Sequence, residues 1–151
     1  MKTKILFIED NKTKIDDVKS FTLETFTNTE IIVKESFTSG LRELFTNNYD
    51  LVFLDMSLPT REGSPSNSLN NFEQLGGHKI LSEMKRKKKI VPTLLITMFR
   101  EFGIGKSFLD LKEVDEMCRD EFPEIYKGVV YYSSREEGWK ENLNNYLVDF
   151  I

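Results

Sequence analysis

Leu51-Val52-Phe53-Leu54-Asp55 is the stretch that decides the fold of this chain. Four consecutive apolar residues without alternation indicate a strand that is covered on both faces, as in a parallel sheet. Asp55 comes at the carboxyl end of that strand, the edge at which open α/β sheets bind ligands. Pro59 follows shortly after and prevents an immediate helix. We therefore expect a rigid strand to hold one carboxylate at the functional edge of a sheet.

Strand and helix patterns alternate along the rest of the chain. Strand patterns cover residues 4–8, 30–33, 91–96 and 128–132, and helical patterns cover residues 12–26, 38–48, 78–88, 99–127 and 139–150. Such alternation predicts right-handed crossovers and a mostly parallel sheet. We expect an α/β fold in which a five-stranded parallel sheet, in the order 2-1-3-4-5, carries helices on both faces. No linker or repeat divides the chain, so residues 1–151 are predicted to form one domain.

Two segments are longer than this alternation requires. Residues 60–76 are rich in turn-forming residues and poor in apolar ones, which indicates an exposed loop inserted after strand 3. Residues 99–127, between strands 4 and 5, are mixed and mostly helical in period, with Gly103 and Gly105 near their start. The first insertion would lie beside Asp55, at the same edge of the sheet.

The composition is that of an ordinary soluble globular protein with one core. The chain has 151 residues, of which 39% are hydrophobic and 30% charged, and its net charge of −4 does not favour a nucleic-acid-binding surface. The single cysteine, Cys118, cannot form an internal disulfide, which fits a reducing compartment. The apolar run at residues 5–8 is too short for a signal peptide, and no segment reaches membrane-spanning length. We therefore expect a cytoplasmic protein without a membrane segment.

Acidic residues follow two of the predicted strands. Glu9 and Asp10 end the first strand, which in the order 2-1-3-4-5 is the neighbour of the strand that ends in Asp55. Two unit charges ~4 Å apart cost about 4 kcal/mol at an effective dielectric constant of roughly 20, so either one acid keeps its proton or a cation compensates. Carboxylate oxygens suit Mg²⁺, and a carboxylate beside Mg²⁺ can attack phosphorus. The alternative is that these acids are separate helix caps on a solvated rim.

Four segments together resemble the receiver domain of two-component response regulators. They are residues 4–11, with the first strand and its acidic pair, residues 51–59, with the phosphoacceptor strand, residues 77–81, with a glycine before the third helix, and residues 92–97, with a strand that ends in a hydroxyl. Gly63 is the alternative to Gly77 for that glycine, because its spacing from Asp55 matches the family. The match spans essentially the whole chain. The resemblance implies a part in two-component signalling, with a histidine kinase or phosphotransfer protein as phosphoryl donor and a downstream protein as partner.

The resemblance also implies roles for the acidic residues. Asp55 would be the phosphorylated aspartate, in a Mg²⁺-dependent reaction. Glu9 and Asp10 would hold Mg²⁺ together with Asp55 and the backbone carbonyl of Ser57. The chain would not be an enzyme beyond Mg²⁺-dependent self-phosphorylation and dephosphorylation at Asp55.

The residues that would respond to phosphorylation depart from the family pattern. Thr97 would be the switch hydroxyl and Tyr131 the switch aromatic, as the resemblance implies. The family carries a lysine just after strand 5, whereas this chain has Ser134 at the best-matching position and Arg135 as the alternative cation. Met98 stands where the family prefers a small residue, which would narrow access to the acceptor. The resemblance therefore predicts a preserved acidic site and a rebuilt switch.

Three other functions compete with this one. A phosphorylation-independent pseudo-receiver, acting as a protein-interaction module, would explain the missing lysine and both insertions. A small Mg²⁺-dependent phosphohydrolase would need a general acid two residues after Asp55, where the chain has Ser57. A flavin-binding protein is disfavoured because Glu9 and Asp10 would repel the flavin phosphate. A homodimer formed through the face of strands 4 and 5 is a further expectation.

Overall fold

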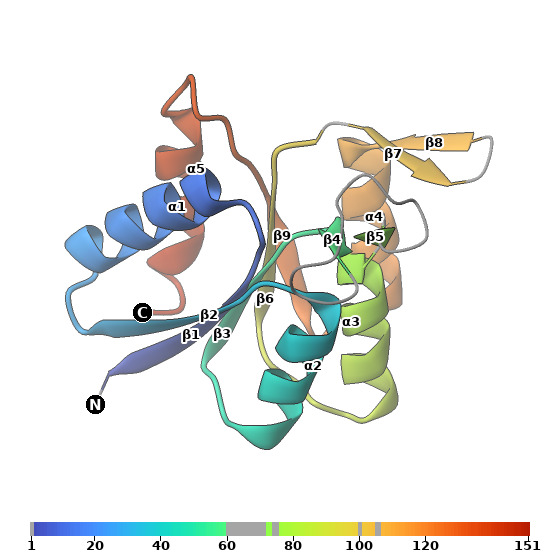
Figure 1. The fold of residues 1–151 in the computed structure, drawn as a ribbon, viewed down its shortest axis with the longest axis horizontal. Helices are drawn as coiled ribbons and strands as arrows, with labels where there is room; N and C mark the ends of the chain where they lie inside the picture. Colours follow the sequence, from blue (N-terminus) through green and yellow to red (C-terminus); the bar gives the residue numbers. More distant parts are fainter. Residues whose placement is uncertain (1, 60–71, 74–75, 100, 105–106) are drawn as a thin grey trace.

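Five parallel strands form the central sheet of the computed structural model, which describes residues 2–59, 72–73, 76–99, 101–104 and 107–151 (Figure 1). The strands are β1 (Thr3–Ile8), β2 (Thr29–Lys34), β3 (Leu51–Leu54), β6 (Thr93–Thr97) and β9 (Tyr126–Tyr131). Their order is β2-β1-β3-β6-β9, and each neighbouring pair is parallel. The predicted order 2-1-3-4-5 is therefore confirmed.

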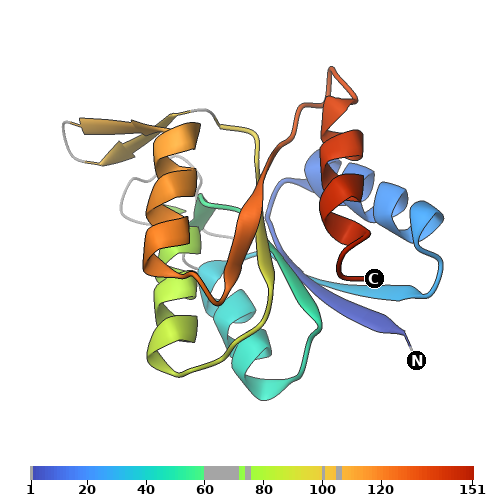
Figure 2. The same ribbon diagram turned by 180° about the vertical axis from the view of Figure 1, so that it is seen from behind.

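Helices cover both faces of the sheet, as the sequence predicts. One face carries α1 (Lys12–Thr25) and α5 (Gly138–Leu147), and the other carries α2 (Phe37–Thr46), α3 (Gly76–Arg86) and α4 (Leu111–Glu121) (Figure 1). The view from behind shows the same division, with α5 beside α1 and α4 beside α3 (Figure 2). Phe7 and Phe53 pack in the cluster under α1 and α5, whereas Ile8 and Leu54 pack in the cluster under the other helices. Burial on both sides explains why these strands are apolar without alternation.

The segment between β6 and β9 differs from the sequence expectation. Residues 99–127 are predicted to be mostly helical, but β7 (Glu101–Ile104) and β8 (Ser107–Asp110) form an antiparallel hairpin before α4. The helical period begins only after Asp110, which caps α4 by accepting a hydrogen bond from the Glu113 N–H at 2.8 Å. The residues before this cap pair across the hairpin, so the helical prediction is wrong for them and right for α4.

The insertion after β3 starts and ends in a short pairing. Residues 60–71 and 74–75, with most of the predicted loop and with Gly63, lie outside the described residues. The described residues next to them form β4 (Leu58–Pro59) and β5 (Phe72–Glu73), which are antiparallel, with Leu58 opposite Glu73. The insertion therefore leaves and re-enters the described fold at adjacent positions near the end of β3.

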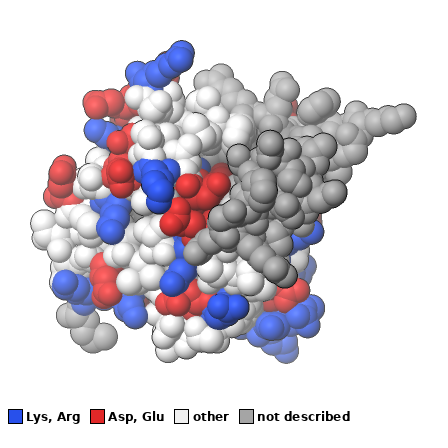
Figure 3. Space-filling model, in the orientation of Figure 1, with Lys and Arg blue, Asp and Glu red and all other residues white. Residues whose placement is uncertain are grey.

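Charged side chains of both signs share the described surface. Figure 3 shows Lys and Arg interspersed with Asp and Glu on the face that Figure 1 presents. This distribution agrees with the small net charge of −4. Within the described part of the chain, no helix is both long enough and apolar enough to span a membrane.

Gly77 packs the start of α3 against the segment that follows β3. Its N–H donates to the carbonyl of Met56 at 2.9 Å, and a Cβ at this position would lie 2.5 Å from the carbonyl oxygen of Asp55. We expect Gly77→Ala to lower the free energy of unfolding by ~1–3 kcal/mol, because the backbone around Asp55 must shift. Urea unfolding followed by circular dichroism measures this loss. Gly138→Ala is the matched control, since a Cβ there meets no atom within 4 Å. Equal stability of the two variants would contradict the tight packing.

Cys118 is fully buried in the cluster under α4. Burial raises the pKa of its thiol to about 12, and the charges of Glu121 and Asp115 add to the shift. Only the thiolate is reactive, and roughly one thiol in 10⁴ would be ionised at pH 8. We expect the folded protein not to react with Ellman's reagent over minutes, and to react fully once guanidinium chloride unfolds it. Rapid reaction of the folded protein would show that the thiol is accessible.

Candidate functional site

Three carboxylates meet at the carboxyl edge of the sheet. Ile8 of β1 pairs with Leu54 of β3, so the residues that follow them, Glu9 and Asp55, leave the sheet side by side. Asp10 comes next along the chain, and one oxygen from each acid lies within 4.8 Å of the other two. Glu9 and Asp55 are only 1% and 3% exposed, and Asp10 is half-buried. The structure therefore brings together the three acids that the sequence places at strand ends.

A lysine that the motifs do not identify lies inside this cluster. Asn11 caps α1, and its side chain accepts a hydrogen bond from the Lys14 N–H at 3.0 Å. The Lys14 side chain is fully buried, and its Nζ lies 3.2 Å from Oδ1 of Asp55. The same ammonium forms an ion pair with Oε1 of Glu9. One positive charge is thus shared between two buried carboxylates.

The position of Lys14 on α1 is the sequence signal that could have identified it. Lys14, Val18 and Thr22 are spaced four residues apart and are all buried, together with Ile15. Side chains with this spacing share one helix face. Lys14 therefore belongs to the buried stripe of α1 and not to its polar face. A lysine in such a stripe needs an acid within reach, and the acidic pair directly precedes the helix.

The three acids of the cluster are harder to ionise than free carboxyl groups. Burial raises the pKa of Glu9 to about 8, a shift that the Lys14 ammonium opposes and the Asp55 carboxylate increases. Burial also raises the pKa of Asp55, again against the effect of Lys14, and it raises the pKa of Asp10 with help from Asp55. For Lys14, burial lowers the pKa, but Asp55 and Glu9 outweigh burial, so the ammonium keeps its proton. If all three acids were ionised, the single ammonium would leave two negative charges unbalanced, which is why the fold favours proton uptake or a bound cation here.

The donor set fits a hard divalent cation. All three acids offer carboxylate oxygens, which suit Mg²⁺, and the ion would balance the two negative charges that remain when all three are ionised. Ser57 is buried in the segment between β3 and β4, two residues after Asp55. The N–H of Met56 donates to Oδ1 of Asp55 at 3.0 Å, so this segment bends around the carboxylate. The residues that could hold the ion are Glu9, Asp10 and Asp55, together with the backbone carbonyl of Ser57.

Thr97 and Tyr131 end neighbouring strands at the same edge of the sheet. Thr97 is buried at the end of β6, the strand beside β3, and it pairs in register with Tyr131 of β9. Tyr131 lines an open hollow of about 350 Å³ with residues 110–112, at the start of α4. Met98 follows Thr97 and packs toward α1, where the side-chain amide of Asn11 lies 3.7 Å from its sulfur. The ends of β6 and β9 thus lie at the same edge of the sheet as the acidic cluster, and Tyr131 extends this edge to the start of α4.

The chain after β9 contacts α1 one turn beyond Lys14. Tyr132, the first residue after the strand, is buried, and its hydroxyl donates to Asp17 of α1. Ser134 and Arg135 are exposed, and Ser134 lines a hollow of about 300 Å³ with residues of α1 and α5 that do not include the acidic cluster. Among the residues that the structure describes, the cation that contacts the cluster is Lys14.

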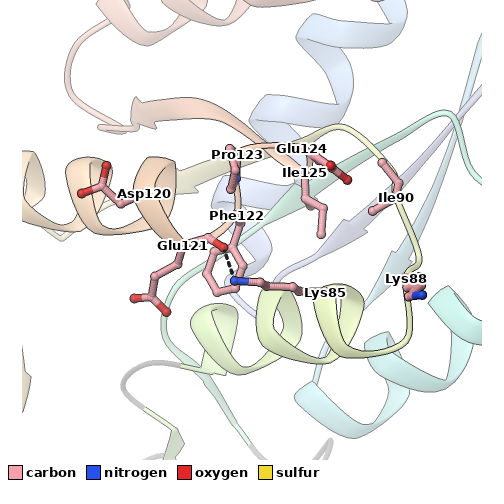
Figure 4. A pocket seen from close by; sticks show the side chains of 9 residues that line it. All are labelled: Lys85, Lys88, Ile90, Asp120, Glu121, Phe122, Pro123, Glu124 and Ile125. Atoms are coloured by element: carbon pink, nitrogen blue, oxygen red, sulfur yellow. Dashed lines mark hydrogen bonds between the residues drawn. The ribbon is translucent and has the colours of Figure 1, made fainter.

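A separate hollow of about 450 Å³ lies at the opposite edge of the sheet. The end of α3, the connection to β6 and the connection from α4 to β9 line it (Figure 4). Lys85 crosses it and donates to the carbonyl of Glu121 at 2.8 Å (Figure 4). Ile90 and Ile125 come just before β6 and β9, so this hollow is at the amino ends of the strands. It is therefore not part of the acidic site, which lies at their carboxyl ends.

Comparisons with known proteins agree with the fold. No family model matches the chain. The Detocs response regulatory protein DtcB of Enterobacter cloacae (strain JD6301) is 28% identical over 142 residues, which cover 93% of this chain and 95% of that protein. The structure of the phosphorylated cyanobacterial phytochrome response regulator RcpA matches 99% of this chain and 94% of its own, with a TM-score of 0.68 and 15% identity.

A second solved structure is the response regulator TrrA of Thermotoga maritima in complex with Mg²⁺ and BeF. It matches 95% of this chain and 97% of its own, with a TM-score of 0.58 and 22% identity. These likenesses extend over the whole parallel sheet and its helices, not over one motif. The resemblance that the four sequence segments indicate is confirmed, and this chain has the fold of the response regulator receiver domain.

Proposed function

We propose that this chain is a signalling receiver that accepts a phosphoryl group on Asp55 in a Mg²⁺-dependent reaction and thereby changes its binding to a downstream partner. The observation that carries the proposal is the buried cluster of three carboxylates and one ammonium around the end of β3. The donor would be a histidine kinase or a phosphotransfer protein, in line with the relative from Enterobacter cloacae, which is named a response regulatory protein. The complex of TrrA with Mg²⁺ and BeF supports the magnesium requirement.

Asp55 is suited to act as the nucleophile. It directly follows β3, and the hydrogen bond from the Met56 N–H fixes its carboxylate before a donor arrives. One carboxylate oxygen would attack phosphorus, and the leaving group would take the electron pair of the broken bond, which produces an acyl phosphate. Bound Mg²⁺ would supply charge neutralisation for the phosphoryl oxygens. The chain would act on itself alone, through phosphorylation and dephosphorylation of Asp55.

Thr97 and Tyr131 would carry the signal away from Asp55. Thr97 ends the strand next to β3, where its hydroxyl could donate a hydrogen bond to a phosphoryl oxygen. Its register partner Tyr131 borders the start of α4. A movement of Thr97 toward the phosphoryl group would therefore change the surface that β9 and α4 form. We expect the downstream partner to bind this surface.

The competing interpretation, a phosphorylation-independent interaction module, depends mainly on the missing lysine after β9. That argument loses weight because Lys14 brings a positive charge to Asp55 from α1. A receiver can thus have a complete set of charges around its acceptor without a lysine after the last strand.

Incubation with Mg²⁺ and acetyl phosphate should add one phosphoryl group to the wild-type chain and none to Asp55→Asn, because a carboxamide is a poor nucleophile. Intact-mass spectrometry measures the gain. Asp16→Asn is the matched control, since it removes an exposed acid of α1 and should leave the labelling unchanged. A folded wild-type chain that stays unlabelled, both with acetyl phosphate and with its own kinase, would contradict the proposal.

Removal of the metal should stop phosphorylation, because the phosphoryl group must approach three acids. We expect EDTA to abolish labelling and added Mg²⁺ to restore it. Asp10→Asn should weaken Mg²⁺ binding at least ~10-fold, because it removes a ligand carboxylate. Isothermal titration calorimetry measures the dissociation constant, again with Asp16→Asn as the control. Labelling that continues in EDTA, or an unchanged dissociation constant in Asp10→Asn, would argue against a magnesium site here.

A further inference from the structure

Lys14 reaches the acidic cluster from the first turn of α1. The cap formed by Asn11 fixes this turn, and the lysine side chain is fully buried. Its Nζ lies 3.2 Å from Oδ1 of Asp55 and forms an ion pair with Glu9. A rigid element therefore holds one positive charge directly beside the carboxylate that would accept the phosphoryl group.

Stability alone does not account for a lysine at this place. Burying an ammonium costs several kcal/mol, and a buried ion pair is often no more stabilising than apolar residues of similar volume. Ile15 and Val18, on the same stripe of α1, pack in the apolar cluster between α1, α5 and the sheet. An apolar residue would thus suit this face of the helix, and a lysine there indicates a function of the charge itself.

We propose that Lys14 binds the phosphoryl group on Asp55 and is the cationic side chain that assists formation of the acyl phosphate. The inference rests on the proposed function, since it takes Asp55 as the acceptor. In transfer from acetyl phosphate, a carboxylate oxygen of Asp55 forms a bond to phosphorus. The bond between phosphorus and the bridging oxygen breaks, and acetate leaves with its electron pair. The phosphoryl oxygens keep their charge, so the step needs no proton donor and no redox partner.

The charge of Lys14 matches what the transfer changes. Before the reaction, the ammonium faces the single charge of the Asp55 carboxylate. After the reaction, the Asp55 side chain carries a phosphoryl group with a charge of about −2. An ammonium has three N–H donors, so Lys14 can keep its ion pair with Glu9 while it donates to a phosphoryl oxygen. Because this contact strengthens as the new bond forms, it lowers the barrier and not only the energy of the bound state.

The end of β9 is tied to the same helix. The hydroxyl of Tyr132 donates to Asp17, which lies one turn after Lys14 on α1. Helix α1 thus supplies the cation of the acidic cluster and also holds the chain that follows β9. A contact between Lys14 and the phosphoryl group would be linked through this turn of α1 to the chain after β9.

Lys14→Met tests the inference, because methionine is of similar length and carries no charge. With Mg²⁺ and acetyl phosphate, we expect its phosphorylation to be ~100-fold slower than that of the wild-type chain, a size typical for loss of one transition-state donor. Lys12→Met is the matched control, since Lys12 is an exposed lysine of the same helix that pairs with Glu35, and it should react at the wild-type rate. Thermal unfolding in Mg²⁺ establishes that each variant is folded. Lys14→Gln is the second variant if the methionine variant does not fold.

A second measurement does not require phosphoryl transfer. Lys14→Met should bind Mg²⁺ more tightly than the wild-type chain, because the ammonium no longer competes for Asp55 and Glu9. It should bind beryllium fluoride in the presence of Mg²⁺ ~10-fold more weakly, because one charged donor to the anion is lost. Calorimetry measures both affinities. A lysine with a merely structural role would change the melting temperature without these two opposite changes.

Each outcome decides the inference. Phosphorylation of folded Lys14→Met at nearly the wild-type rate would overturn it, while the function of Asp55 would stand. If the wild-type chain accepts no phosphoryl group from acetyl phosphate or from its own kinase, the proposed function and the inference both fail. Where the wild-type chain is labelled, slower labelling of Lys14→Met together with its weaker binding of beryllium fluoride would support the inference. Equal binding of beryllium fluoride by the two chains would overturn it.

Discussion

The parallel pairing of β1 with β3 is the constraint on which the acidic site depends. Ile8 and Leu54 face each other in register, so Glu9 and Asp55 must leave the sheet as neighbours. Both strands are buried on their two faces, and a shift of one residue would turn each side chain toward the wrong layer. The backbone therefore holds two carboxylates together against their repulsion. The ammonium of Lys14 reduces this repulsion from within the fold.

The origin of that ammonium changes how the site is connected to the rest of the molecule. It comes from a helix that begins immediately after the acidic pair, and not from the chain after the last strand. Tyr132, which follows that strand, points to Asp17 of the same helix. Two contacts one turn apart on α1, at Lys14 and Asp17, thus join the acidic cluster to the end of β9. In this arrangement α1 is a structural link between Asp55 and β9, the strand at the edge of the sheet.

The packing around Asp55 differs between its two sides. Gly77 places the start of α3 so close to the backbone of Asp55 and Met56 that a single added carbon would collide with it. Asp55 is therefore held firmly on the α3 side. On the other side, β6 and β9 end in Thr97 and Tyr131, next to an open hollow at the start of α4. The β7–β8 hairpin precedes α4 and adds surface there (Figure 1). Under the proposed function, we expect the response to phosphorylation on that side.

Local patterns were enough to identify the sheet and its acidic edge. A run of apolar residues and the acid that follows it are neighbours in the sequence, so both can be found without the folded structure. The order of strands followed, and with it the meeting of Glu9, Asp10 and Asp55. The hairpin before α4 was missed because the strong helical period of α4 dominated a mixed segment. The spacing of Lys14 in the buried stripe of α1 indicates that it faces the sheet, but only the folded chain brings it to Asp55. Whether a lysine is solvated or buried is decided by an acid that another strand brings within reach, and Asp55 is remote from it in sequence. No local pattern reports such a contact, since it exists only after β1 and β3 have paired.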